Sequence, residues 1–102
     1  MKNYNKLVRD LIPEVIKADG KECEIEIAAK EDRSELLEAK LMEEVNEYLQ
    51  DKNLEELADV MEVLFALADN LGYKEEDLLN KREEKRLKRG GFKKGIILKE
   101  VK

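Results

Sequence analysis

The sequence predicts a mostly α-helical protein, in which antiparallel helices form a bundle that oligomerisation completes. Apolar residues recur every three or four positions over 33–50 and over 54–71, which is the period of a helix with one buried face. Only a short break separates the two segments, so the helices are expected to fold back on each other. Such a hairpin leaves an apolar face uncovered in a chain with 42% hydrophobic residues, and this favours self-association.

The remaining elements are expected within a single domain, residues 1–102. A short helix begins near Pro13, which suits a first turn, and ends near Gly20. Apolar residues alternate over 22–27, and a β-branched run fills 95–101. These two segments predict a small two-stranded β element packed on the helices. A third long helix is expected from Lys74 or Glu75 to Arg89, where two glycines end it.

Two pairs of polar residues at i,i+3 spacing predict where the long helices begin. Asp32 with Glu35, and Asn53 with Glu56, are placed as capping boxes before the two long helices.

Composition excludes several kinds of site and partner. The chain has no histidine, which removes Ser-His-Asp and Cys-His catalysis and any zinc site that uses histidine. Its one cysteine, Cys23, allows no internal disulfide and fits a reducing, cytoplasmic setting. The net charge of −5 argues against a nucleic-acid polymer as partner. No apolar run approaches the roughly 18 residues of a membrane span, so no membrane partner is expected.

Four carboxylates form two pairs at i,i+3 spacing, Glu44 with Glu47 and Glu56 with Asp59. Acidic residues are common in this chain, with 25 Asp and Glu, so their position on each helix decides their meaning. At about 100° per residue, Glu56 falls with the apolar Val63 and Leu67 rather than on the solvent stripe.

On the preceding helix, Glu44 continues an apolar seam formed by Leu37, Leu41 and Tyr48. An unpaired buried charge is costly, and hard divalent cations such as Mg²⁺ prefer carboxylate oxygens. A cation among the four carboxylates is therefore expected. The alternative is that they are ordinary surface acids and that Glu56 is a capping residue.

The third long helix is rich in basic residues. Lys81, Lys85 and Lys88 share one face, and Arg82, Arg86 and Arg89 share the adjacent face. Lysine and arginine suit phosphate groups, although a solvated face with i,i+4 ion pairs explains the same pattern.

Together these segments resemble a known family. Glu43-Glu44-x-x-Glu47 followed by Glu56-x-x-Asp59 resembles the signature of the MazG-like nucleoside triphosphate pyrophosphohydrolases, in the all-α superfamily that includes phosphoribosyl-ATP pyrophosphohydrolase. Residues 4–14 and 85–98 resemble the opening and the ending of a small subgroup, so the resemblance covers nearly the whole chain.

The resemblance implies a homodimer or homotetramer that hydrolyses a nucleoside triphosphate, or a related polyphosphate, between the α and β phosphates. The products would be a monophosphate and pyrophosphate, as in the house-cleaning of nucleotide pools. The cofactor would be Mg²⁺, or Mn²⁺ in its place. The resemblance implies metal ligands (Glu44, Glu47, Glu56 and Asp59), catalytic residues (Glu43, Glu44 and Glu47) and substrate-binding residues (Asn80, Lys81, Lys85 and Arg89).

The resemblance assigns no role to Lys6 or Arg9 in the opening segment. The alternatives to an enzyme are a helical oligomerisation module and a nucleotide-sensing module without turnover. The complete carboxylate set favours the enzyme, because buried charges cost stability when they serve no purpose.

Overall fold

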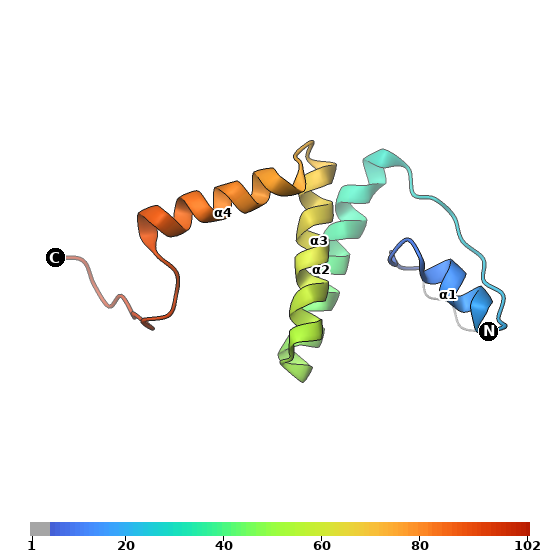
Figure 1. Cartoon of the computed structure of the whole chain (residues 1–102), viewed down its shortest axis with the longest axis horizontal. Helices are drawn as coiled ribbons and strands as arrows, with labels where there is room; N and C mark the ends of the chain where they lie inside the picture. The colour runs from blue at the N-terminus through green and yellow to red at the C-terminus, as the bar shows by residue number, and fades with distance from the viewer. Residues whose placement is uncertain (1–4) are drawn as a thin grey trace.

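The computed structural model describes residues 5–102, and this part of the chain holds four α-helices and no strand (Figure 1). They are α1 (Ile12–Ala18), α2 (Arg33–Asp51), α3 (Leu54–Asn70) and α4 (Glu75–Arg89), with one 3₁₀ turn, η1 (Lys30–Asp32), before α2. The predicted bounds of α2, α3 and α4 agree with these to within one residue. The molecule is elongated, with extents of 61 × 31 × 23 Å.

An antiparallel hairpin of α2 and α3 forms the centre of the molecule (Figure 1). Lys52 adopts a left-handed conformation at the turn, and its N–H donates to the Tyr48 carbonyl at 2.7 Å. At the other end, the Asn70 side-chain amide donates to Ser34 Oγ at 2.7 Å. These two contacts fix the register, so that the second half of α2 faces the first half of α3.

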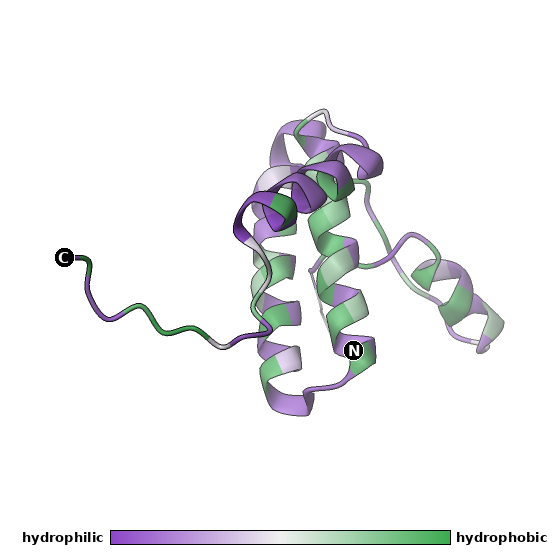
Figure 2. Ribbon diagram, turned by 60° about the vertical axis from the view of Figure 1, so that its left-hand side comes forward, coloured by the Kyte–Doolittle hydropathy of each residue, from purple (hydrophilic) through white to green (hydrophobic). Residues whose placement is uncertain are grey.

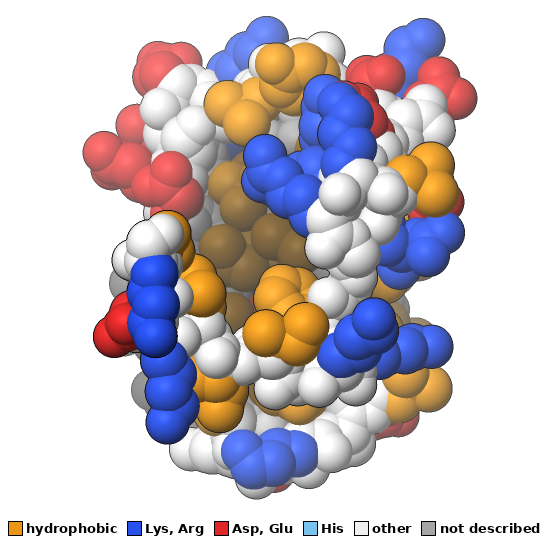
Figure 3. Space-filling model, turned by 90° about the vertical axis from the view of Figure 1, so that its left-hand side faces the viewer, with side chains coloured by type: hydrophobic (Ala, Val, Ile, Leu, Met, Phe, Trp, Pro, Cys, Tyr) orange, Lys and Arg blue, Asp and Glu red, His pale blue; other side chains and the backbone are white. Residues whose placement is uncertain are grey.

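The buried interior of one chain is small. Within residues 5–102, only Leu37, Val63 and Ala68 are hydrophobic residues that are less than a tenth exposed. Figure 2 shows hydrophobic positions along both helices of the hairpin, and Figure 3 shows hydrophobic side chains in a hollow on the face from which α4 projects. A stripe along α3 and the residue after it remains exposed: Leu54, Leu57, Met61, Leu64 and Leu71. One chain thus supplies a hairpin, and completion of the bundle by oligomerisation stays a prediction.

The predicted two-stranded β element is wrong. Residues 22–27 and 95–101 are both extended coil, and Ile25 and Ile27 are exposed. A strand needs a partner, and α4 carries the C-terminal segment away from residues 22–27 to the opposite end of the molecule (Figure 1). The alternation of apolar residues over 22–27 favours a strand locally, but no second strand lies beside this segment in the described part of the chain.

The two predicted capping boxes have different outcomes. Asp32 occupies the N-cap position of α2 but makes no side-chain capping hydrogen bond, because η1 already leads into the helix there. Asn53 does cap α3, since its Oδ1 accepts from the Glu56 N–H at 2.9 Å. The short helix predicted at Pro13 is confirmed as α1. None of the described helices combines the length and the apolar character needed to cross a membrane.

The turn between α3 and α4 depends on a glycine. Gly72 has a φ of +95°, and the Tyr73 N–H donates to the Ala68 carbonyl at 2.9 Å across it. This is the Schellman arrangement that ends a helix at a left-handed residue. It sends α4 away from the hairpin.

We expect Gly72→Ala to lower the free energy of unfolding by about 1 kcal/mol, because alanine is strained at this φ. No atom lies within 4 Å of the added Cβ, so the cost is conformational rather than steric. Gly91→Ala is the matched control, because Gly91 has equal space and no positive φ, and it should leave stability nearly unchanged. Urea denaturation of both variants measures the difference, and equal effects would contradict the explanation.

Candidate metal centre

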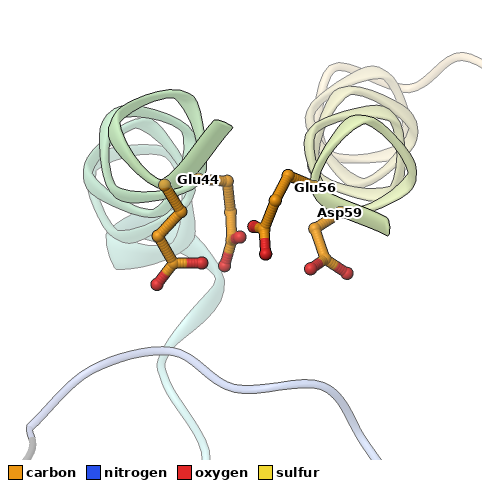
Figure 4. Close-up of side chains that lie close together, drawn as sticks. Glu44, Glu56 and Asp59 are labelled. Carbon is orange, nitrogen blue, oxygen red and sulfur yellow. The ribbon is translucent and has the colours of Figure 1, made fainter. Parts of the chain in front are cut away.

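The hairpin brings the four predicted carboxylates into one group. Each pair is one helical turn apart, so Glu44 and Glu47 share a face of α2, and Glu56 and Asp59 share a face of α3. Figure 4 shows the carboxylates of Glu44, Glu56 and Asp59 pointing to the same side of the two helices. One oxygen from each of the four residues lies within 4.8 Å of the others. We call these four residues the carboxylate group.

The spacing of these oxygens fits a small divalent cation. Mg²⁺ binds oxygen at 2.0–2.1 Å, so opposite ligands around it lie about 4.2 Å apart. The observed limit of 4.8 Å is about 0.6 Å wider, a difference that rotations of flexible side chains can close. The donor set, four carboxylates and no sulfur or imidazole, is the one that hard cations prefer.

Glu44 is the most buried member of the group and the one whose position is most unusual. It is 7% exposed, which confirms that it continues the apolar seam of α2. Its Oε1 pairs with Lys40 Nζ at 3.1 Å, one helical turn earlier. Its Oε2 is buried and has no hydrogen-bond partner among the described residues. A buried carboxylate oxygen without a hydrogen-bond partner lowers the stability of the folded state.

Glu56 shows the same feature in a different setting. Its backbone N–H donates a hydrogen bond to the Asn53 side chain, which caps α3. Its side-chain Oε2 is buried and has no hydrogen-bond partner in the described part of the chain. The capping alternative for Glu56 therefore concerns only its backbone, and its carboxylate remains with the group. The first turn of α3 also favours a negative charge, because the N-terminal end of a helix is partly positive.

Cations surround the group without balancing it. Arg9 Nη2 pairs with Asp59 Oδ1 at 2.7 Å, and Lys40 contacts Glu44. Glu43 lies beside the group rather than in it, and it pairs with Lys6 at 2.9 Å and with Lys40 at 3.4 Å. Of the five carboxylates, counting Glu43 with the group, three pair with these three cations, which leaves the two negative charges of Glu47 and Glu56 without an ion pair among residues 5–102. One divalent cation would neutralise them.

The repulsion within the group appears in its pKa values. The nearby Glu44 carboxylate, with smaller effects of burial and of Glu56, raises the pKa of Glu47. Burial, followed by the charge of Asp59, raises the pKa of Glu56. Outside the group, the hydrogen bond from Lys6 lowers the pKa of Glu43. Glu47 and Glu56, whose pKa values are raised, therefore hold protons more readily than ordinary glutamates do.

The structure does not bring the predicted substrate-binding residues to this group within one chain. They all lie on α4: Asn80, Lys81, Lys85 and Arg89. α4 begins at the end of the hairpin opposite the turn at residues 51–53, and it runs away from α2 (Figure 1). Part of its charge is used locally, since Lys81 and Lys88 pair with Glu84, and Arg86 pairs with Glu83.

The cations that do reach the carboxylates are ones to which sequence reasoning gave no role. Lys40 could have been recognised, because it lies three and four residues before Glu43 and Glu44, at ion-pair spacing on a helix. Lys6 and Arg9 contact residues 37 and 50 positions away, and no local pattern predicts such contacts.

Comparisons of this chain with protein-family models, with curated proteins and with solved structures found no match. The candidate site therefore rests on its own geometry and charge.

We expect the metal-free protein to become more stable as the pH falls from neutrality to about 5, because the pKa values of Glu47 and Glu56 are raised in the folded state. The folded chain takes up protons above the ordinary value of 4.5, where the unfolded chain does not. Glu43, Glu83 and Glu84 have lowered pKa values, and their contribution is lost only below that range.

Melting temperatures in EDTA across this pH range measure the effect. Glu47→Gln should raise the melting temperature at neutral pH and flatten the trend, since it removes one repelling charge. Glu38→Gln, an exposed position on the same helix, should do neither. Stability that falls steadily from pH 7 to 5 in the wild-type chain would contradict the proposed repulsion.

Proposed function

We propose that this protein is a Mg²⁺-dependent pyrophosphohydrolase that cleaves nucleoside triphosphates, or related polyphosphates, between the α and β phosphates. The observation that carries the proposal is the convergence of four carboxylates, of which Glu44 and Glu56 each have a buried Oε2 with no hydrogen-bond partner among the described residues. The signature-like spacing of Glu43, Glu44, Glu47, Glu56 and Asp59 supports it independently. The products would be a nucleoside monophosphate and pyrophosphate.

The residues fit a divalent cation in number, type and charge. Glu44, Glu47, Glu56 and Asp59 would hold it, and two uncompensated negative charges match its charge. The chemistry that Mg²⁺ supplies in such a site is neutralisation and orientation of phosphate oxygens. Mn²⁺, which accepts the same oxygen ligands, would serve in its place.

The catalytic glutamates would have different tasks because their surroundings differ. Glu47 is half-buried and its pKa is raised, so it is suited to accept a proton from the water that attacks the α phosphorus. As the new phosphorus–oxygen bond forms, the bond to the β phosphate breaks and pyrophosphate leaves. Glu44 would act as a fixed ligand, and Glu43 would hold Lys6 and Lys40 beside the reacting group.

Self-association belongs to the same proposal. The exposed stripe on α3 includes Leu54, which is 81% exposed, and Met61, which is 54% exposed, and this is a large apolar area for one chain to leave uncovered. A second copy would cover it and complete the bundle. In that assembly, α4 of one chain would extend to the carboxylate group of the other and bring Lys85 and Arg89 to the phosphates.

The first test is release of pyrophosphate from a panel of canonical and modified nucleoside triphosphates, with Mg²⁺ or with EDTA. We expect metal-dependent release with a monophosphate as the second product. Glu56→Gln should lower the rate by about 100-fold or more, because it removes a charged ligand from the group. Glu62→Gln, an exposed position on the same helix, is the matched control and should leave the rate unchanged.

Two outcomes would contradict the proposal in different ways. A melting temperature that rises with Mg²⁺ and nucleotide, without any product, would instead indicate a sensing module. A folded protein with no response to Mg²⁺ or nucleotide would indicate an oligomerisation module.

The proposed contribution of α4 across the interface is tested by mixing two inactive variants. Glu56→Gln lacks a metal ligand, and the double variant Lys85→Gln, Arg89→Gln lacks the basic contacts. After the subunits exchange at random in a dimer, about a quarter of the wild-type activity should return, because half of the dimers then contain one intact site. No recovery in a mixture that demonstrably exchanges subunits would mean that α4 does not act on the partner's site.

A further inference from the structure

The segment before α1 crosses the open side of the carboxylate group. Figure 4 shows this N-terminal segment passing on the side to which the carboxylates of Glu44, Glu56 and Asp59 point. Arg9 ties the segment to α3 through Asp59, at 2.7 Å, and Lys6 ties it to α2 through Glu43, at 2.9 Å. The two cations thus lie on the open side of the carboxylate group, Lys6 beside α2 and Arg9 beside α3.

We propose that Lys6 and Arg9 bind the phosphate groups of the substrate, and that they exchange their ion pairs with Glu43 and Asp59 for phosphate oxygens when it enters. This inference rests on the proposed function and adds to it. It assigns the phosphate contacts within one chain to the N-terminal segment, which the sequence pattern left without a role.

The contacts of Arg9 suit such an exchange. Its side chain is 54% exposed, and among the described residues it makes a single hydrogen bond, to Asp59 Oδ1. A guanidinium has five donors in a planar fork, so most of them remain available for a second anion. Exposed ion pairs contribute little to stability, whereas arginine binds phosphate through two parallel hydrogen bonds. Once a metal cation binds the Asp59 carboxylate, transfer of the Arg9 guanidinium from Asp59 to a phosphate group is therefore favourable.

The spacing of the two residues suits a polyphosphate. Lys6 and Arg9 are three residues apart, so at most about 10 Å of chain separates them, which is close to the usual distance between two packed helices. On the Lys6 side, a small pocket opens between residues 5–7 and α2, where Lys6, Lys40 and Glu43 line it. This pocket places two lysines together, which suits phosphate groups, and Lys40 connects it to the carboxylate group through its contact with Glu44.

A purely structural role is the competing explanation, in which the two ion pairs merely attach the N-terminal segment to the hairpin. The two roles differ in what a neutral substitution would change. A structural attachment affects stability and metal binding together, while a phosphate contact affects phosphate binding alone.

The experiment measures two dissociation constants by titration calorimetry on the full chain, one for Mg²⁺ alone and one for inorganic pyrophosphate in excess Mg²⁺. We expect Arg9→Gln and Lys6→Gln each to weaken pyrophosphate binding by about tenfold or more, with Mg²⁺ binding within about twofold of wild type. Arg9→Lys keeps the charge beside Asp59 but lacks the fork, so it should fold normally and lose part of the affinity. Lys21→Gln, which removes a more exposed cation that pairs with Asp19, is the control and should change neither constant.

Pyrophosphate binding that is unchanged in both Arg9→Gln and Lys6→Gln would overturn this inference while leaving the proposed function intact. If both variants lose Mg²⁺ binding together with pyrophosphate binding, or fail to fold, the two residues serve only to attach the N-terminal segment to the hairpin. Failure of the wild-type chain to bind Mg²⁺ would overturn the proposed function, and the phosphate contacts with it.

Discussion

Burial of the Glu44 carboxylate is the constraint on which the rest of this structure depends. The α2–α3 hairpin places a nearly inaccessible carboxylate beside three more, and one of its oxygens has no hydrogen-bond partner in the described part of the chain. Packing alone would favour an apolar residue at that point of the seam. An unpaired charge there lowers the stability of the fold by far more than a surface ion pair raises it. A hairpin with so small an apolar interior has little stability to spare. The cation proposed for this site would offset the repulsion.

The same constraint orders the charges around the group. Lys40 is supplied by α2 itself, while Lys6 and Arg9 come from a segment that has no helix of its own at that point. Without a metal, these cations are the nearest compensation for the carboxylates, and their attraction holds the segment in place. A metal competes for the same oxygens. The position of the N-terminal segment and the occupancy of the carboxylate group are therefore coupled, and by linkage each must affect the other.

The sequence was sufficient where the determining interactions are local, and insufficient where they are not. Helical periodicity located α2, α3 and α4 and showed that Glu44 and Glu56 interrupt apolar faces, because residues within a turn or two settle such questions. The strands expected at 22–27 and 95–101 failed because a strand depends on a distant partner, and the direction of α4 separates the two segments. Lys6 and Arg9 were unassignable for the same reason, since their partners lie on helices far along the chain.

The two sides of α3 separate the chemistry from the proposed interface between copies. At about 100° per residue, Asp59 and Met61 point in nearly opposite directions, so the apolar stripe faces away from the carboxylates. A second copy can therefore cover Leu57, Met61 and Leu64 without closing the side on which phosphates would enter. The N-terminal segment already occupies that open side and supplies cations from the same chain. In the proposed assembly, basic residues from α4 would approach this side from the partner, so that one short chain could carry an acidic centre and a basic helix without the two neutralising each other.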